Sequence, residues 1–226
     1  MDLILSSGFL AFARHIGVLR ALEEAEIPLA AVTGTSSGAL IGALWTAGHT
    51  SHDLEKLLSQ IAPWRLLRPN LQPWQGILST TAFLNFLRPL LPPTFADLPR
   101  PLAVGVIDVK RRHKLLTSGP LVEAVVASCA MPHVFAPVQV GPERLADGGT
   151  LDRLALGAWR QWRPGQPAIA HQVERTAGRD QPLDLTDVLL VRTPRSGANF
   201  FSLGPFAQQV EEARQVAEEA IRAGKK

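Results

Sequence analysis

The first half of the chain alternates short apolar runs with segments in which apolar residues recur every three or four positions. Residues 3–6 form an apolar run, which predicts a short strand buried on both faces, as in a parallel sheet covered by helices. Residues 13–25 show helical spacing with acidic residues on the outward side. A second strand at 30–33 leads into a small-residue helix at 39–47. This β-α-β-α order predicts a parallel, right-handed α/β layer.

The rest of the chain continues as helices and strands between loops. Its last helical segment carries one apolar stripe, which favours packing of a terminal helix against the core. Residues 166–172 give weak structural signals, and residues 135–140 are interpreted as extended. The predicted helices cover 53–61, 80–91, 121–130, 154–162 and 206–222, and the predicted strands cover 101–109, 114–117 and 188–191, of which the first two pair as a hairpin.

Length, composition and charge are those of an ordinary globular protein. With 226 residues, of which 46% are hydrophobic and 19% charged, the chain can bury one substantial core, so we expect a single domain over residues 1–226. The net charge of +3 is mild, and the basic run at 110–114 is typical of a solvated hairpin turn, so we expect no nucleic-acid partner. The single cysteine, Cys129, excludes an intrachain disulfide and a cysteine-pair zinc or redox motif.

Two apolar stretches resemble export or membrane signals but lack the features those signals need. Residues 3–13 end like a signal-peptide cleavage site, yet Asp2 stands where a signal peptide needs positive charge. Residues 27–52 carry no Asp, Glu, Lys or Arg, but proline, glycine and hydroxyl residues interrupt them, which favours a buried turn over a bilayer span. We therefore expect a cytoplasmic protein without a signal peptide or a transmembrane helix.

A proline-broken segment at 63–74 interleaves Trp64, Leu67 and Trp74 with arginines and has no regular periodicity, which predicts a loop. Indole and guanidinium groups both suit the headgroup zone of a bilayer. Two interpretations stay open: the segment is a lid or a bilayer contact, or its aromatic residues pack within the protein. The first predicts a protein that lies peripherally on a membrane.

The strongest chemical signal is Gly34-Thr35-Ser36-Ser37-Gly38, which lies between the second predicted strand and the small-residue helix. A strained strand-to-helix turn needs small residues two positions either side of its serine, because the backbones there come too close for side chains. Ser36 would then stand at a helix start, where N–H groups without intrahelical partners help to stabilise an anionic oxygen. The pattern predicts a nucleophile elbow.

A serine nucleophile needs a base within hydrogen-bond reach. Asp147 is the candidate, because Gly148 and Gly149 after it let the backbone approach another loop closely, although Asp-Gly-Gly is also a common tight turn. The chain order serine, acid, histidine makes Ser36, Asp147 and His171 an alternative triad. Without a histidine, Asp147 itself must be the base, which requires a poorly solvated site that raises its pKa toward the working pH.

Four stretches together resemble the bacterial patatin-like phospholipases, in the order in which that family has them. The resemblance covers about residues 3–160 and implies a three-layer α/β/α sandwich with a mostly parallel central sheet. It also implies hydrolysis of acyl esters through a catalytic dyad of Ser36 and Asp147, with no metal or other cofactor. The stretches are Leu5-Ser6-Ser7-Gly8 with His15-Ile16-Gly17-Val18-Leu19, Gly34-Thr35-Ser36-Ser37-Gly38-Ala39, Ala127-Ser128-Cys129-Ala130-Met131-Pro132 with Val134-Phe135-Ala136-Pro137, and Asp147-Gly148-Gly149 with Asp152.

The segment that resembles the family's glycine-rich oxyanion loop departs from its G-G-G-x-R/K-G pattern, because one glycine of four remains and the basic residue is missing. We expect the Gly8 and Phe9 N–H groups to hold the oxyanion together with the Ser37 N–H. Arg14 either replaces the lost charge or is a solvated helix residue. The six residues at the family's positions are Ser7, Gly8, Phe9, Leu10, Ala11 and Phe12.

These observations predict a serine acyl hydrolase that acts on phospholipids or related acyl esters at a membrane face, through an acyl-enzyme intermediate. The altered glycine segment leaves a second hypothesis open, a catalytically weak or inactive member that binds lipid or a partner protein. A third is a Ser-His-Asp esterase that uses His171. The sequence carries no pattern that specifies an oligomeric state.

Overall fold

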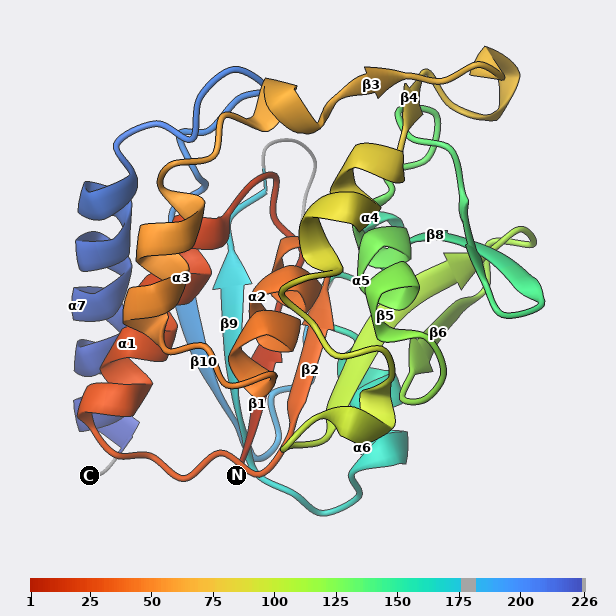
Figure 1. Cartoon of the computed structure of the whole chain (residues 1–226). Coiled ribbons are helices and arrows are strands. Elements are labelled where there is room, and N and C mark those ends of the chain that lie inside the picture. Colours follow the sequence, from red (N-terminus) through yellow and green to blue (C-terminus); the bar gives the residue numbers. More distant parts are fainter. Residues whose placement is uncertain (176–181, 225–226) are drawn as a thin grey trace.

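The computed structural model of the chain describes residues 1–175 and 182–224, and it is organised around an eight-stranded sheet (Figure 1). The path runs through β10 (Val188–Thr193), β9 (Ala168–Val173), β1 (Asp2–Leu5), β2 (Val32–Thr35), β5 (Leu102–Asp108), β8 (Glu143–Asp147) and β7 (Val138–Val140), with β6 (His113–Leu116) paired to β5 off this path. The strands from β10 to β5 are parallel, whereas β6, β8 and β7 pair antiparallel. The sheet is therefore mostly parallel.

Helices cover both faces of this sheet (Figure 1). Side chains alternate along a strand, so that Leu3 and Leu5 of β1 enter the larger core while Ile4 packs on the opposite face with Trp159. The predicted three-layer α/β/α sandwich is confirmed, with most helices on the face of the larger core and α6 on the other. The helices are α1 (Phe12–Glu24), α2 (Ser37–Thr46), α3 (Ser51–Leu58), α4 (Thr81–Leu87), α5 (Leu121–Cys129), α6 (Leu156–Trp162) and α7 (Phe206–Gly224).

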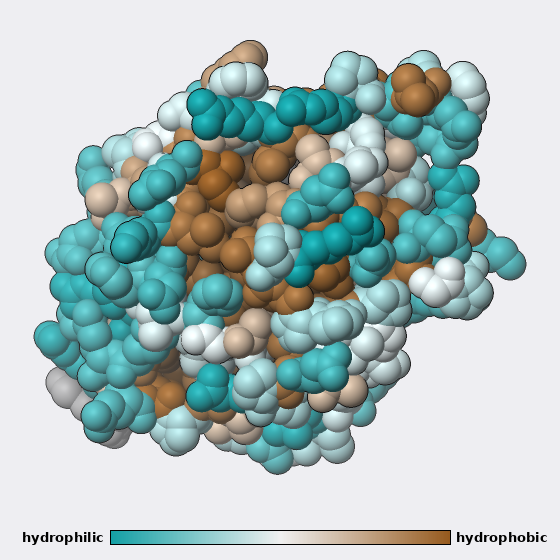
Figure 2. Space-filling view, in the orientation of Figure 1, coloured by the Kyte–Doolittle hydropathy of each residue, from teal (hydrophilic) through white to brown (hydrophobic). Residues whose placement is uncertain are grey.

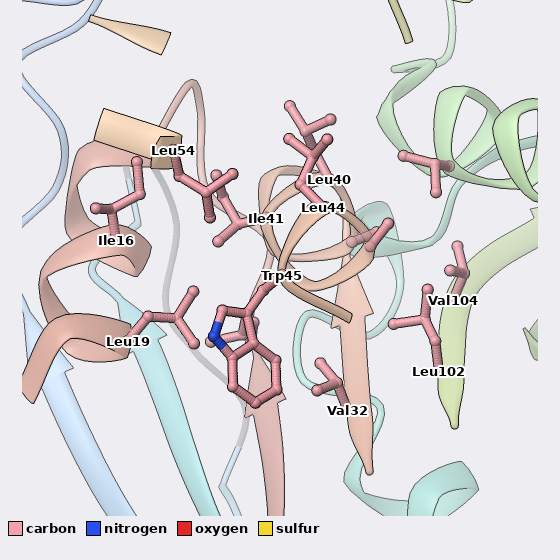
Figure 3. Close-up of a cluster of buried hydrophobic side chains, with 14 of the residues drawn as sticks. Ile16, Leu19, Val32, Leu40, Ile41, Leu44, Trp45, Leu54, Leu102 and Val104 are labelled. Carbon is pink, nitrogen blue, oxygen red and sulfur yellow. The ribbon is translucent and has the colours of Figure 1, made fainter. Parts of the chain in front are cut away.

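The helix α2 lies in the middle of the larger core, and all ten of its residues are buried (Figure 3). Its Ile41, Leu44 and Trp45 lie among apolar side chains of α1, α3 and β2. Close packing on the sheet requires a small residue, because a Cβ on Gly42 would come within 2.9 Å of the Val32 side chain. Packing on all sides fixes the start of α2, which is the end that follows Ser36.

The predicted helices and strands are present, with ends that differ by a few residues. The basic run at 110–114 makes the turn into β6, and the apolar stripe of α7 is buried against α1 and β10. Residues 166–172, where the sequence signals are weak, form most of β9 between β10 and β1. A hydrophobicity pattern does not predict this strand, because the strand is wholly buried yet contains the polar residues His171 and Gln172. Among the described residues, no helix is both long and apolar enough to cross a bilayer.

Candidate active site

Ser36 occupies a strained turn between β2 and α2. Its backbone has a φ of +54° and a ψ of −120°, a conformation that costs a non-glycine residue about 1–3 kcal/mol. Two residues of α5 hold it in place, because the Ser36 N–H donates to the Ser128 hydroxyl at 2.8 Å and the Cys129 thiol donates to the Ser36 carbonyl at 3.2 Å. Ser128 in turn donates to the Gly105 carbonyl of β5 at 2.7 Å. The turn has the strand, turn and helix setting that a nucleophile elbow requires.

Gly34 and Gly38 allow three backbone segments to meet around this turn. A Cβ on Gly34 would lie 2.4 Å from the Gly38 carbonyl oxygen, and a Cβ on Gly38 would lie 2.3 Å from the Leu5 carbonyl oxygen. Real Cβ atoms do not approach backbone atoms so closely. The close approach inferred from the glycine spacing is therefore present in the structure.

Asp147 reaches Ser36 because two strand ends meet along one edge of β5. β2 pairs with the first half of β5 and ends with Thr35 opposite Gly105, whereas β8 pairs with the second half and ends with Asp147 opposite Val106. β6 pairs with β5 over residues 104–107, which overlap both of these halves, so β6 lies on one edge of β5 and β2 and β8 share the opposite edge. Because β8 runs antiparallel to β5, its C-terminal end points toward the C-terminal end of β2.

Asp147 is 8% exposed, and its carboxyl group accepts a hydrogen bond from the segment that follows it. The Gly149 N–H donates to its Oδ1 at 2.7 Å, and the Ser36 side chain lies close enough to influence its pKa. Burial raises the pKa of Asp147 to about 6, while the Gly149 N–H and the Ser36 hydroxyl oppose the rise. A carboxylate of raised pKa beside a serine hydroxyl can accept the serine proton at neutral pH.

The glycines after Asp147 also meet neighbouring backbones closely. A Cβ on Gly148 would lie 2.7 Å from the Gly105 carbonyl, and a Cβ on Gly149 would lie 2.4 Å from the Cβ of Ser7. Gly149 therefore brings the segment after β8 against the segment after β1. Asp-Gly-Gly is a turn here, and it is also the point where two loops of the site touch.

The segment after β1 places backbone amides near Ser36. Gly8 and Phe9 line the same cavity as Ser36 and Asp147. Within the described residues, the N–H groups of Gly8, Phe9 and Ser37 have no protein acceptor, and that of Ser37 lies in the first turn of α2. These three amides stay the predicted oxyanion donors.

A cavity of about 570 Å³ lies beside Ser36 and Asp147. In Figure 2, apolar surface gathers in a hollow near the centre of the displayed face, bordered by hydrophilic residues. Ligand pockets typically measure about 300–1,000 Å³ and are mostly apolar, so the cavity suits a molecule with a long hydrocarbon part. Its apolar lining residues include Leu40, Leu58, Ile61, Leu66, Leu67, Phe83, Phe86, Met131, Phe135 and Phe200.

One wall of the cavity comes from a strap, residues 63–79, that crosses the edge of the molecule where the parallel strands end (Figure 1). It contains two short helical turns and the β3 (Arg68–Pro69) and β4 (Leu78–Ser79) pair. Leu78 anchors it, because its N–H donates to the Val134 carbonyl at 2.8 Å and its carbonyl accepts from the Ala136 N–H at 3.0 Å. The strap is therefore a fixed wall in this structure.

His171 lies outside the site that contains Ser36 and Asp147. It is fully buried in β9, with its Nδ1 2.8 Å from the Nδ1 of His15 and its Nε2 2.8 Å from the Thr193 hydroxyl. Burial lowers the pKa of His171 well below its usual value. Both ring nitrogens are engaged, and neither contacts Ser36 or Asp147. The structure does not bring the alternative triad together.

Arg14 differs from both sequence interpretations. It is 5% exposed rather than solvated, and its Nη1 lies 2.7 Å from the Glu212 carboxylate of α7. It does not line the cavity, so it does not replace the missing charge. Both interpretations are wrong because α7 covers this side of α1. Within residues 1–175 and 182–224, no group of three His, Cys, Asp or Glu side chains is placed to hold a metal ion.

Three further residues support the site and were not singled out from the sequence. Ser128 holds the Ser36 backbone, the His15 Nε2 lies 3.2 Å from the Ser37 hydroxyl, and Arg153 contacts the segment after β1. Ser128 and His15 fall within the stretches that carry the family resemblance, which was the available signal. Arg153 lies outside those stretches, so no sequence signal pointed to it.

A sequence model described as patatin-like phospholipase matches residues 3–158, which is more than half of the chain and includes Ser36 and Asp147. The chain belongs to the patatin-like phospholipase family. The predicted resemblance is thereby confirmed.

Known relatives share this family core in longer chains. An uncharacterized NTE family protein of Mycobacterium tuberculosis is 35% identical over 158 residues, which cover 68% of this chain and 44% of the relative. The chain thus spans less than half the length of that relative. Among solved structures, VipD from Legionella pneumophila aligns with a TM-score of 0.62 and 14% identity, covering 98% of this chain and 66% of VipD. ExoU from Pseudomonas aeruginosa, solved in complex with SpcU, aligns with a TM-score of 0.55 and 14% identity, covering 99% and 52%. These two likenesses show a shared fold.

Proposed function

We propose that the chain is a serine acyl hydrolase that cleaves acyl esters of phospholipids or related lipids with Ser36 and Asp147. The observation that carries the proposal is the buried Asp147 carboxyl group, of raised pKa, next to a strained elbow serine on the wall of an apolar cavity. The cavity receives the acyl chain, and the ester carbonyl lies at Ser36. Family membership supports this reaction class.

In the proposed reaction, Asp147 takes the Ser36 proton while the serine oxygen attacks the acyl carbonyl carbon. The Gly8, Phe9 and Ser37 amides hold the resulting oxyanion. The intermediate collapses by releasing the alcohol, which receives the proton from Asp147 and leaves an acyl-enzyme. Asp147 then takes a proton from water while the resulting hydroxide attacks the acyl carbon. When this second intermediate collapses, the free acid is released and Asp147 returns the proton to the Ser36 oxygen.

The direct test is turnover of a p-nitrophenyl acyl ester and of a phospholipid by Ser36→Ala and Asp147→Asn. Each variant should lose hydrolysis of both substrates, because one lacks the nucleophile and the other lacks the base. Asp184→Asn, which changes a surface carboxylate outside the cavity, is the matched control and should keep full activity. Turnover retained by either dyad variant would overturn the assignment.

Two rivals make different predictions. A non-catalytic lipid-binding member would bind lipid without stoichiometric labelling of Ser36 by a fluorophosphonate, whereas the hydrolase should be labelled at that residue. A triad esterase would lose activity in His171→Gln, whereas the dyad predicts that this variant turns over whenever it folds. The engaged ring nitrogens of His171 favour the dyad.

We also propose that the strap contacts the membrane that holds the substrate. Leu71 is 96% exposed and Trp74 is 77% exposed, and Trp64, with Arg65 over its ring, is 48% exposed. Leu67, which the sequence grouped with the tryptophans, instead lines the cavity. Exposed indole and leucine side chains beside an acyl cavity suit the bilayer interface.

Liposome sedimentation tests this contact. Replacing both Leu71 and Trp74 with serine should weaken binding at least about tenfold, since burying one large apolar side chain is worth about 1.5–3 kcal/mol. Val109→Ser is the matched control, because Val109 is 72% exposed in the turn after β5 and is not part of the strap at residues 63–79. Equal binding by the double variant and the wild-type protein would refute the contact.

A further inference from the structure

Arg153 grips the segment that carries the proposed oxyanion amides. Its Nη2 donates to the Ser7 carbonyl at 2.7 Å and to the Val173 carbonyl at 2.6 Å, and its Nε donates to the Ser7 hydroxyl at 3.2 Å. In return, the Ser7 N–H donates to the Arg153 carbonyl at 2.9 Å. Arg153 thus binds both the carbonyl and the N–H of Ser7, the residue directly before Gly8.

This segment needs such support. It retains one glycine, and Leu10 adopts a φ of +47°, in the left-handed region that favours glycine. A Cβ on Gly8 would come within 2.8 Å of the Ala11 side chain, so the turn is tightly folded on itself. Amide donors stabilise an oxyanion only when they are held in position before it forms. A charged guanidinium holds a carbonyl more strongly than a neutral donor does.

Arg153 also lines the cavity together with Ser36 and Asp147. Arg14, which follows this segment closely in the sequence, instead forms an ion pair with Glu212 of α7. Positive charge beside the segment therefore comes from the chain after Asp147 and not from the segment itself.

We propose that Arg153 is a positioning residue, which anchors the segment at Ser7 so that the Gly8 and Phe9 amides meet the oxyanion. The proposal rests on the proposed hydrolase function. In this proposal Arg153, which follows β8, holds the altered glycine segment in position, because that segment lacks most of the glycines and the basic residue of the family pattern.

The test compares kcat and KM of Arg153→Ala, Arg153→Lys and Arg160→Ala with a long-chain p-nitrophenyl ester. Loss of one oxyanion donor lowers turnover by about 10²–10³-fold, so kcat of Arg153→Ala should fall by about 10²-fold or more, with KM changed less than about threefold. Arg153→Lys should recover part of kcat, because an ammonium can still reach one carbonyl. Guanidinium ion, far below denaturing concentrations, should raise kcat of Arg153→Ala.

Arg160→Ala is the matched control. Arg160 donates to the Asp184 and Thr186 carbonyls and does not line the cavity, so its variant should keep wild-type kcat. A kcat of Arg153→Ala within threefold of wild type would overturn the proposal. So would a loss that neither lysine nor guanidinium repairs, because that loss would reflect packing alone.

If Arg153→Ala does not fold, Arg153→Lys decides the question. A reduced kcat at unchanged KM then supports the positioning role, and an unchanged kcat overturns it. Failure of the underlying function has a different signature, because the wild-type protein itself would hydrolyse no ester and Ser36 would not react with a fluorophosphonate.

Discussion

Replacing Asp147 with asparagine should raise the stability of the folded protein at pH 8 while it removes catalysis. The ionised carboxylate is nearly buried, and burial raises its pKa to about 6. In the unfolded chain an aspartate has a pKa of about 3.9, so the folded state binds the proton more tightly. Stability therefore falls as the pH rises from about 4 through about 6, because the folded state then has to ionise a group it holds best when neutral.

The size of the effect follows from the two pKa values. One pKa unit corresponds to about 1.4 kcal/mol, so ionisation of Asp147 destabilises the folded protein by about 3 kcal/mol at pH 8 and by about 1 kcal/mol at pH 4.5. Asparagine is neutral at both values and retains an oxygen that can accept the Gly149 N–H. The stability gained by Asp147→Asn should therefore be about 2 kcal/mol larger at pH 8 than at pH 4.5.

Urea unfolding of the wild-type and variant proteins at both pH values measures this difference directly. Other carboxyl groups titrate equally in the two proteins and cancel in the comparison. Asp184→Asn is the control, because hydrogen bonds from Thr186 lower the pKa of this exposed carboxyl group and its removal should give no gain at pH 8. A variant that is no more stable than wild type at pH 8, or a gain that is the same at both pH values, would refute the reasoning.

Three further predictions concern the same site. The kcat/KM for a neutral ester should fall about tenfold per pH unit below the Asp147 pKa of about 6 and level off above it, and a flat profile between pH 4.5 and 7 would exclude Asp147 as the base. Gly34→Ala should unfold the elbow or abolish fluorophosphonate labelling, because its Cβ would lie 2.4 Å from a backbone oxygen. Gly157→Ala in α6 is the control: its Cβ would meet no atom within 4 Å, so the free energy of unfolding, measured by thermal unfolding, should rise by about 0.5–1 kcal/mol. Ser128→Ala should lose about 1–3 kcal/mol of stability, because it leaves the Ser36 N–H and the Gly105 carbonyl without their partner, and an unchanged melting temperature would contradict that role.

The elbow and the fold class could be predicted from local sequence. Apolar runs and helical spacing are properties of neighbouring residues, so the β-α-β-α order and the buried α2 follow from them. The glycines at 34 and 38 are also local, since the backbones that exclude a Cβ there belong to the turn itself and to the strand next to it. Asp147 could be named as a candidate because two glycines follow it.

The meeting of these parts was decided only by the tertiary structure. Asp147 faces Ser36 because β8 runs antiparallel along the same edge of β5 as β2, beyond the point where β2 ends, a pairing that no local pattern specifies. The same long-range packing turned Arg14 toward α7 and brought Arg153 against Ser7. Periodicity reports which face of an element is buried, whereas the partner that buries it depends on strand order, and strand order is a property of the whole chain.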